Sequence, residues 1–145
     1  MSKLRVGLVG ARGYTGAELI RLIAAHPRFE LAYVTSRELD GQRVAEHTPT
    51  FAGELRFSNP AHDTLPQLAA DAVILALPNG KAGAIVQAFD AAGSHPVIID
   101  LSADYRFDPR WYYGLPELTR SHYAGRTRIR TPGCYPTAID LAILQ

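Results

Sequence analysis

The chain has 145 residues, of which 47% are hydrophobic and 20% are charged, and its formal net charge is +1. This length and composition predict a single globular domain. The near-neutral charge, with Lys and Arg spread along the chain, argues against a nucleic-acid or membrane surface as the main partner, and no apolar run approaches the roughly 20 residues that cross a membrane.

Strand and helix patterns alternate along the sequence. Pro27 ends the first helical stretch because helices usually stop before the residue that precedes a proline, and Gly93 closes the second. Residues 43–64 are broken by prolines and a glycine, and residues 104–125 are rich in Tyr, Pro and Gly and indicate an ordered loop. In chain order we predict a strand at 4–9, a helix at 15–25, strands at 30–35 and 55–57, a short helix at 65–70, a strand at 72–77, a helix at 82–92, strands at 97–101 and 126–131, and a closing helix whose first turn contains Pro136.

This alternation is typical of an α/β fold with a parallel sheet and right-handed crossovers. In such folds ligands bind beyond the carboxyl ends of the strands. Gly10, Ser36, Pro78 and Ser102 each fall just past a predicted strand. The sequence therefore predicts a binding site along one edge of the sheet.

A glycine-rich loop follows the first strand and opens the first helix. Its glycines, Gly10, Gly13 and Gly16, are spaced G-x-x-G-x-x-G. Glycine lets the backbone approach a pyrophosphate, and the helix start near Thr15 offers N–H groups and a positive dipole to phosphates. The loop therefore favours a nucleotide site, with a plain strand-to-helix turn as the alternative.

The residues after the second predicted strand indicate which nucleotide is bound. An NAD site usually carries Asp or Glu about 20 residues after the last fingerprint glycine, where this chain has Ser36 and Arg37. A guanidinium binds a 2′-phosphate through charge-assisted hydrogen bonds, and Arg12 in the glycine loop could add a second cation. NADP(H) is therefore favoured, unless Arg37 is only a solvated loop charge.

Cys134 is the only cysteine, which suits a reducing cytoplasm. Pro132, Gly133 and Pro136 restrict the backbone on both sides of it, and the helix that follows favours the thiolate form of the sulfur. This setting predicts a catalytic nucleophile; the alternative is a buried cysteine that acts as a small hydrophobe.

Other polar and aromatic residues give weaker signals. Arg106 lies just beyond a predicted strand and could bind an anionic substrate group, or pair with Asp104 or Asp108. Aromatic residues of the same region are expected to pack the loop. No histidine has a partner at metal-ligand spacing, so no metal site is predicted. No role is assigned to any of the five histidines, which are His26, His47, His62, His95 and His122.

Five segments together resemble the N-acetyl-gamma-glutamyl-phosphate reductases, a family of the semialdehyde dehydrogenase superfamily that serves arginine biosynthesis. The matches run in order across nearly the whole chain. They are residues 10–19 (GARGYTGAEL), 75–80 (LALPNG), 100–107 (DLSADYRF), 113–118 (YGLPEL) and 131–138 (TPGCYPTA).

The resemblance implies a Rossmann-type, doubly wound, mostly parallel sheet with helices on both faces. It also implies NADPH-dependent reduction of N-acetyl-glutamyl 5-phosphate to the semialdehyde, through a thioester on Cys134. By position, the phosphate loop would include Tyr14 with Thr15 and the loop glycines, Ser36 and Arg37 would contact the 2′-phosphate, and the nicotinamide side would be lined by Leu77, Pro78 and Ser102.

The resemblance also implies that residues 1–145 are the NADP-binding part of a longer protein. Family members exceed 300 residues, and their second half holds a histidine acid/base and most of the substrate and dimer surfaces. The full-length protein is therefore expected to be a homo-oligomer acting on a small acyl phosphate. Two alternatives stay open: another acyl-phosphate reductase, of the aminoadipyl or aspartyl semialdehyde type, or a non-catalytic NADP-binding module.

Overall fold

The computed structural model describes residues 2–144, and within them strands and helices alternate as an α/β protein requires. The strands are β1 (Leu4–Val9), β2 (Phe29–Thr35), β3 (Phe57–Ser58), β4 (Ala72–Leu75), β5 (Val97–Asp100), β6 (Tyr112–Tyr113) and β7 (Arg128–Arg130). The helices are α1 (Tyr14–Ala25), α2 (Val44–His47), α3 (Ala82–Ala91), α4 (Pro116–Thr119) and α5 (Cys134–Ile143), with 3₁₀ helices η1 (His62–Gln67) and η2 (Arg120–His122).

The described residues form a seven-stranded sheet in the order β3-β2-β1-β4-β5-β7-β6. All neighbouring strands in it pair in parallel. From β1 the chain steps outward to β2 and β3, and then returns to β4 on the other side of β1. This reversal is the topological switch point at which doubly wound folds bind ligands.

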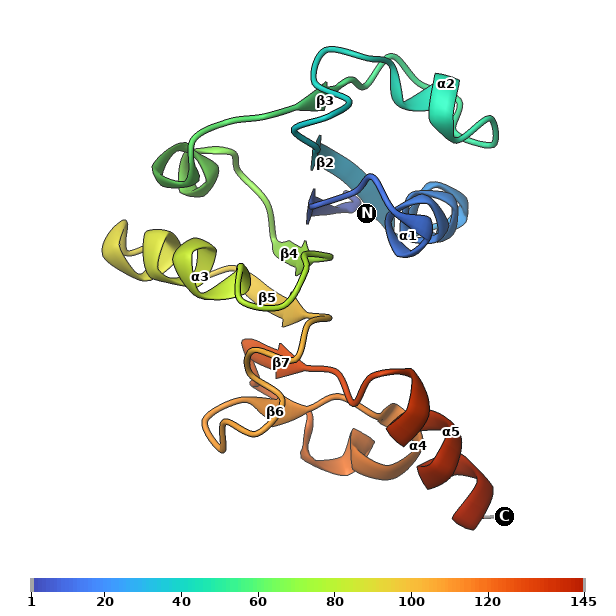
Figure 1. Ribbon diagram of the computed structural model, residues 1–145, viewed down its shortest axis with the longest axis vertical. Coiled ribbons are helices and arrows are strands. Elements are labelled where there is room, and N and C mark those ends of the chain that lie inside the picture. The colour runs from blue at the N-terminus through green and yellow to red at the C-terminus, as the bar shows by residue number, and fades with distance from the viewer. Residues whose placement is uncertain (1, 145) are drawn as a thin grey trace.

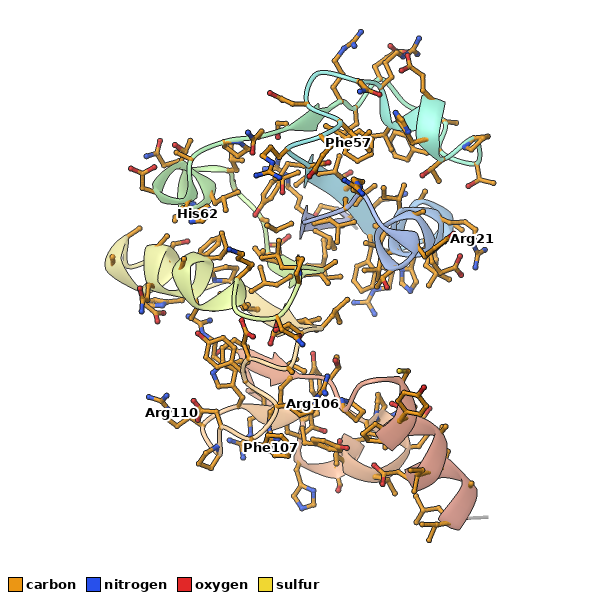
Figure 2. The ribbon with its side chains drawn as sticks, in the orientation of Figure 1. Arg21, Phe57, His62, Arg106, Phe107 and Arg110 are labelled. Atoms are coloured by element: carbon orange, nitrogen blue, oxygen red, sulfur yellow. The ribbon has the colours of Figure 1, made fainter. Side chains whose placement is uncertain are left out.

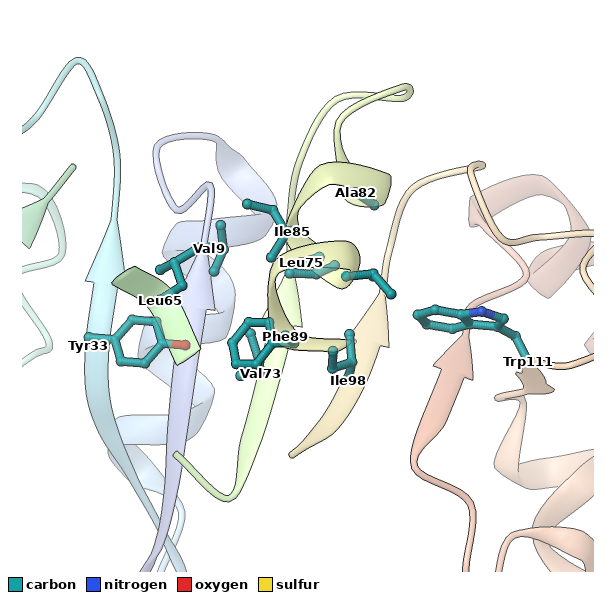
Figure 3. Close-up of a cluster of buried hydrophobic side chains, with 11 residues drawn as sticks. Val9, Tyr33, Leu65, Val73, Leu75, Ala82, Ile85, Phe89, Ile98 and Trp111 are labelled. Carbon is teal, nitrogen blue, oxygen red and sulfur yellow. The ribbon is translucent and has the colours of Figure 1, made fainter. Parts of the chain in front are cut away.

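Helices cover both faces of the sheet, as the sequence predicts (Figure 1). On one face α1 and α2 enclose a cluster that contains Leu8, Ile20 and Val34. On the other, α3 and η1 enclose the larger cluster drawn in Figure 3, in which Phe89 of α3 packs against the strands. Trp111 extends this cluster toward β7 and stacks on Tyr105 with ring centroids 4.0 Å apart, so it packs the loop as expected.

Five predicted elements differ from the structure by two residues or more, or in type. The strand predicted at 126–131 is the three-residue β7, Arg128–Arg130. The helix predicted at 65–70 is the 3₁₀ helix at 62–67, which contains Pro66. The strand predicted at 72–77 ends at Leu75. The strand predicted at 55–57 is the two-residue β3, Phe57–Ser58. The stretch predicted as a loop at 104–125 is ordered but contains β6, α4 and η2.

Among residues 2–144, no helix is both long enough and apolar enough to cross a membrane.

Candidate functional site

A cleft of about 840 Å³ opens at the switch point, beyond the carboxyl ends of β1, β2 and β4. It contains the glycine loop and the residues that follow β2 and β4. Of the predicted cofactor residues, all except Ser102 line it: Gly10, Arg12, Gly13, Tyr14, Thr15, Gly16, Ser36, Arg37, Leu77 and Pro78.

The glycine loop is fixed to the end of β2 by its backbone. The N–H groups of Gly10 and Ala11 donate to the carbonyl oxygen of Thr35 at 3.2 and 2.8 Å. At Gly16 a Cβ atom would lie 2.3 Å from the carbonyl oxygen of Ala11, so only glycine lets α1 start this close to the loop. The sequence therefore brings the start of α1 directly over the end of β1.

The start of α1 is open to an anionic ligand. Gly13 is the N-cap residue and makes no side-chain capping hydrogen bond, and no acidic residue lies in the first turn. A Cβ at Gly13 would meet nothing within 4 Å, and the Tyr14 side chain is 98% exposed. The first N–H groups and the positive end of the helix dipole are thus free for phosphate groups, which fits the pyrophosphate of a dinucleotide.

The residues after β2 form the end of the cleft where the adenosine ribose would bind. Ser36 is 5% exposed, and its Oγ accepts a hydrogen bond from the N–H of Leu39 at 3.3 Å. The Arg37 side chain is 81% exposed and that of Arg12 is 63% exposed. Two long cationic side chains therefore stand at the mouth of the cleft.

The opposite side of the cleft is formed by the turn after β4. Leu77 and Pro78 lie between the end of that strand and α3. The turn is held from the neighbouring loop, because the Asp104 carboxylate accepts hydrogen bonds from the N–H groups of Gly80 at 2.6 Å and Ala82 at 3.0 Å. The Asn79 side chain accepts another from the N–H of Ala103 at 2.9 Å. The first N–H group of α3, that of Ala82, is therefore already paired with a carboxylate of the protein.

Ser102 lies outside the lining of the cleft and is buried. Its hydroxyl donates to the Asp100 carboxylate at 2.9 Å and accepts from the N–H of Asp104 at 3.1 Å. Asp100 is itself fully buried at the end of β5, and burial raises the pKa of its carboxyl above the ordinary value. These contacts hold the loop after β5, so the position of Ser102 favours support of the loop over direct contact with a cofactor.

Cys134 is the first residue of α5 and is exposed. The alternative that it is a buried hydrophobe is therefore wrong. Gly133, its N-cap residue, has a φ of +88°, a conformation that L side chains rarely adopt. The Thr137 hydroxyl donates to the Gly133 carbonyl oxygen at 2.7 Å and fixes this turn from within the helix. The sulfur thus sits on a constrained turn at a helix N-terminus.

Arg106 packs directly against this turn. A Cβ at Gly133 would lie 2.8 Å from Nη2 and 3.0 Å from Cζ of its guanidinium. Its Nε is buried without a hydrogen-bond partner in the described part of the chain. Among residues 2–144 it forms no ion pair: Asp104 caps α3, and Asp108 pairs with Arg110 at 2.6 Å. The predicted alternative, an Arg106–Asp pair, is therefore wrong. Figure 2 shows Arg106 below β5, in the loop that leads to β6.

The cysteine turn and the cofactor cleft share one edge of the sheet but are separate. Cys134 follows β7, which pairs with β5, and β5 pairs with β4. With roughly 4.8 Å between neighbouring strands, the two strand ends that carry Cys134 and Pro78 are about 10 Å apart. The reactive end of a dinucleotide would have to extend from Pro78 across β5 to reach the sulfur.

Sequence reasoning missed several residues of the cleft. Ser36 and Pro78 were predicted because each follows a strand. Asn59 directly follows β3 and would have been predicted in the same way if the end of that short strand had been predicted correctly. Nothing in the spacing indicates that Glu38 turns back toward the glycine loop. The residues that line the cleft and were not predicted include Thr35, Glu38, Asn59, Pro60, His62 and Lys81.

Comparison with known proteins agrees with this arrangement. Residues 5–126 match the family model described as semialdehyde dehydrogenase, NAD binding domain. An N-acetyl-gamma-glutamyl-phosphate reductase from Xanthomonas axonopodis pv. citri is 62% identical over 138 residues, which are 95% of this chain and 44% of the relative. The chain therefore spans less than half the length of this curated relative.

Solved structures of lower identity share the fold. Aspartate semialdehyde dehydrogenase II from Vibrio cholerae superposes with a TM-score of 0.74 at 19% identity, over 98% of this chain and 42% of that one. The Candida albicans aspartate semialdehyde dehydrogenase with NADP gives a TM-score of 0.66 at 19% identity, over 91% of this chain and 42% of that one. The family match, the strand order and the glycine loop over the switch point lead to one conclusion: the chain belongs to the semialdehyde dehydrogenase family and forms its NAD-binding domain.

Proposed function

We propose that this chain is the NADP-binding part of an N-acetyl-gamma-glutamyl-phosphate reductase of arginine biosynthesis. The reaction would be the NADPH-dependent reductive dephosphorylation of N-acetyl-L-glutamyl 5-phosphate to N-acetyl-L-glutamate 5-semialdehyde. The observation that carries the proposal is one sheet edge that holds both an open dinucleotide cleft and an exposed cysteine, whose turn is packed against an arginine that forms no ion pair among residues 2–144. The 62% identity to a Xanthomonas enzyme of that name supports the substrate.

The chemistry of this chain would begin at Cys134. Its thiolate attacks the carbonyl carbon of the acyl phosphate, the C–O bond to phosphate breaks, and inorganic phosphate leaves with that bond's electrons. The acyl group then remains on sulfur as a thioester, so that one difficult displacement is divided into two easier steps. The free N–H groups at the N-terminal end of α5 can bind the oxyanion that forms on the carbonyl oxygen.

Arg106 would bind the phosphate of the substrate. Its guanidinium lies against Gly133, next to the proposed nucleophile, and its buried Nε has no hydrogen-bond partner among residues 2–144. A guanidinium is suited to a phosphate because its planar donors match two phosphate oxygens. Arg106 would thus orient the acyl phosphate and neutralise the charge of the leaving group.

When bound, NADPH supplies the hydride that reduces the thioester to the aldehyde. Toward that cofactor, this chain would contribute the N-terminus of α1 and the glycine loop for the pyrophosphate, and Ser36, Arg37 and Arg12 for the 2′-phosphate. Leu77 and Pro78 would lie beside the nicotinamide, with Ser102 holding the neighbouring loop. The acid/base histidine and the surfaces that form a homo-oligomer would belong to other parts of a longer protein, which we place in the cytoplasm.

The test is an assay of the full-length protein in the reverse direction, with phosphate, NADP⁺ and each of three semialdehydes: N-acetylglutamyl, aspartyl and aminoadipyl. We expect turnover with the N-acetylglutamyl compound, and loss of turnover in Cys134→Ser with NADPH binding unchanged. Preference for the aspartyl or the aminoadipyl semialdehyde would contradict the proposed substrate assignment. Full activity of Cys134→Ser would contradict the mechanism, and NADPH binding without any turnover would leave only a nucleotide-binding module.

A further inference from the structure

A carboxylate occupies the place between the two arginines of the cleft. Oε1 of Glu38 lies 3.4 Å from Nη1 of Arg12 and 3.2 Å from Nη2 of Arg37. Arg12 comes from the glycine loop after β1, whereas the other two residues follow β2, so one acid joins two separate segments. All three residues line the same cleft.

This carboxylate is charged and accessible. The Glu38 side chain is 43% exposed. A hydrogen bond from its own backbone N–H, together with one from Arg37, holds the pKa of its carboxyl below the ordinary value. At neutral pH it therefore carries a full negative charge, at the point where a 2′-phosphate would need the same two guanidinium groups.

We propose that Glu38 is a displaceable counter-ion that sets how strongly this cleft distinguishes a 2′-phosphorylated adenosine from an unphosphorylated one. The proposal rests on the assignment of NADP(H) as the cofactor. In the free protein the single negative charge of Glu38 is paired with both arginines. A bound 2′-phosphate must displace the carboxylate from them, whereas an unphosphorylated ribose can remain beside it and donate a hydroxyl hydrogen bond to it.

The energetics predict the direction of the effect. Both ion pairs are exposed, and exposed pairs are weak, so a 2′-phosphate with two negative charges can break them. Removing the charge of Glu38 frees both guanidinium groups before binding and removes a like charge that faces the incoming phosphate. Affinity for the phosphorylated ligand then rises, while affinity for the unphosphorylated ligand stays constant or falls.

The experiment measures binding of adenosine 2′,5′-bisphosphate and of 5′-AMP to the full-length protein by calorimetry. We expect Glu38→Gln to bind the bisphosphate about three- to tenfold more tightly than the unaltered protein, the range that two exposed ion pairs can supply, with no gain for 5′-AMP. The matched control is Glu54→Gln, which removes an exposed carboxylate from its 2.6 Å pair with Arg43, outside the cleft. That control should change neither affinity.

Two outcomes would overturn the proposal. If Glu38→Gln leaves the ratio of the two affinities unchanged, the ion pairs are ordinary surface contacts. If Glu38→Gln weakens binding of the bisphosphate, the carboxylate holds the arginines in place for the ligand instead of competing with it. Arg37→Ala tests the cofactor assignment separately. Loss of affinity for the bisphosphate in that variant supports NADP(H) whatever the result for Glu38. Unchanged affinity would reject both NADP(H) as the cofactor and Glu38 as its counter-ion.

Discussion

At the scale of single residues, the cysteine turn depends on an absent side chain. Gly133 meets two requirements at once, since its φ is +88° and its missing Cβ leaves room for the Arg106 guanidinium. Gly133 stands directly before the cysteine in the sequence, but no sequence pattern connects it with Arg106, which lies 27 residues earlier in the chain (133 − 106 = 27). Only the fold reveals that Arg106, which we propose binds phosphate, packs against the glycine that directly precedes Cys134.

Gly133→Ala is therefore expected to displace Arg106 and Cys134 together. We expect kcat/KM to fall about a hundredfold, because misplacement by about 1 Å has that effect, while NADPH affinity is unchanged. Gly125→Ala is the control, since Gly125 also has a positive φ, +77°, but nothing within 4 Å of its Cβ position. Equal losses of activity in both variants would show that backbone strain alone is responsible.

Asp108 offers a pH test of the loop that carries Arg106. Hydrogen bonds from the Arg110 side chain and backbone lower the pKa of Asp108 to about 2. A carboxyl whose pKa is lowered by folding stabilises the fold above its unfolded pKa, near 3.9, and this contribution is lost as the pH falls toward 2. NMR titration should show Asp108 titrating near 2, and in Arg110→Ala at a higher pH, closer to the ordinary value of 3.8. An unchanged titration would exclude the arginine as the cause.

At the scale of elements, the loop between β5 and β6 is held by the neighbouring strand. Arg130 of β7 donates from Nε to the carbonyl oxygen of Trp111 at 2.8 Å and from Nη1 to that of Arg106. Its guanidinium also lies 5.2 Å from the centre of the Tyr113 ring. One side chain thus fixes both ends of the segment that positions the proposed phosphate-binding residue.

Arg130→Ala is expected to raise the KM for the acyl phosphate while NADPH affinity stays constant, because the loop loses two carbonyl contacts but the cleft is untouched. Unfolding free energy should fall by about 2 kcal/mol, as for hydrogen bonds from a charged donor. Arg130→Lys keeps the charge but lacks the planar set of donors, so its KM should remain nearly as high as that of Arg130→Ala. Full recovery would mean that charge, not geometry, fixes the loop.

Elements with strong local signals were predicted well, and those shaped by distant contacts were not. The apolar runs before Gly10 and after Gly93 correctly predicted β1 and β5, because parallel strands buried on both faces are near-continuous runs of hydrophobic residues. In the stretch predicted as a loop, Pro116 at the start of α4 is an ordinary N-terminal signal that the surrounding Tyr and Gly residues obscured. The two-residue β6 is defined only by its pairing with β7, which no local pattern reveals.

At the scale of the whole molecule, cofactor binding and acyl chemistry are separated along the chain. The cleft is lined by residues between Val9 and Ile85, whereas the cysteine turn and its arginine come after β5. The glycine loop, the ends of the predicted strands and the family resemblance together named half of the residues that line this cleft. Glu38 escaped prediction because a side chain's direction in a loop depends on which charges the fold brings near it.

This separation predicts the behaviour of the 145-residue chain on its own. It should bind NADPH within about tenfold of the affinity of the full-length protein, because the glycine loop and the other residues that line the cleft described above lie in this chain, yet show no turnover of acyl phosphate. Fluorescence titration with NADPH and an assay of the same sample would check both parts. Loss of NADPH binding would show that other segments complete the cleft.

The capping of α3 by Asp104 gives the cleft a polarity. Two helices begin beside it, and their starts differ: α1 presents unpaired N–H groups, whereas the Asp104 carboxylate already accepts from the first N–H group of α3, that of Ala82, and from Gly80 in the turn before it. An anionic pyrophosphate gains from the first helix and meets a negative charge near the second. A dinucleotide should consequently lie in one sense only, adenosine toward β2 and its redox-active ring toward β5, so the protein itself chooses which end of the coenzyme faces the sulfur.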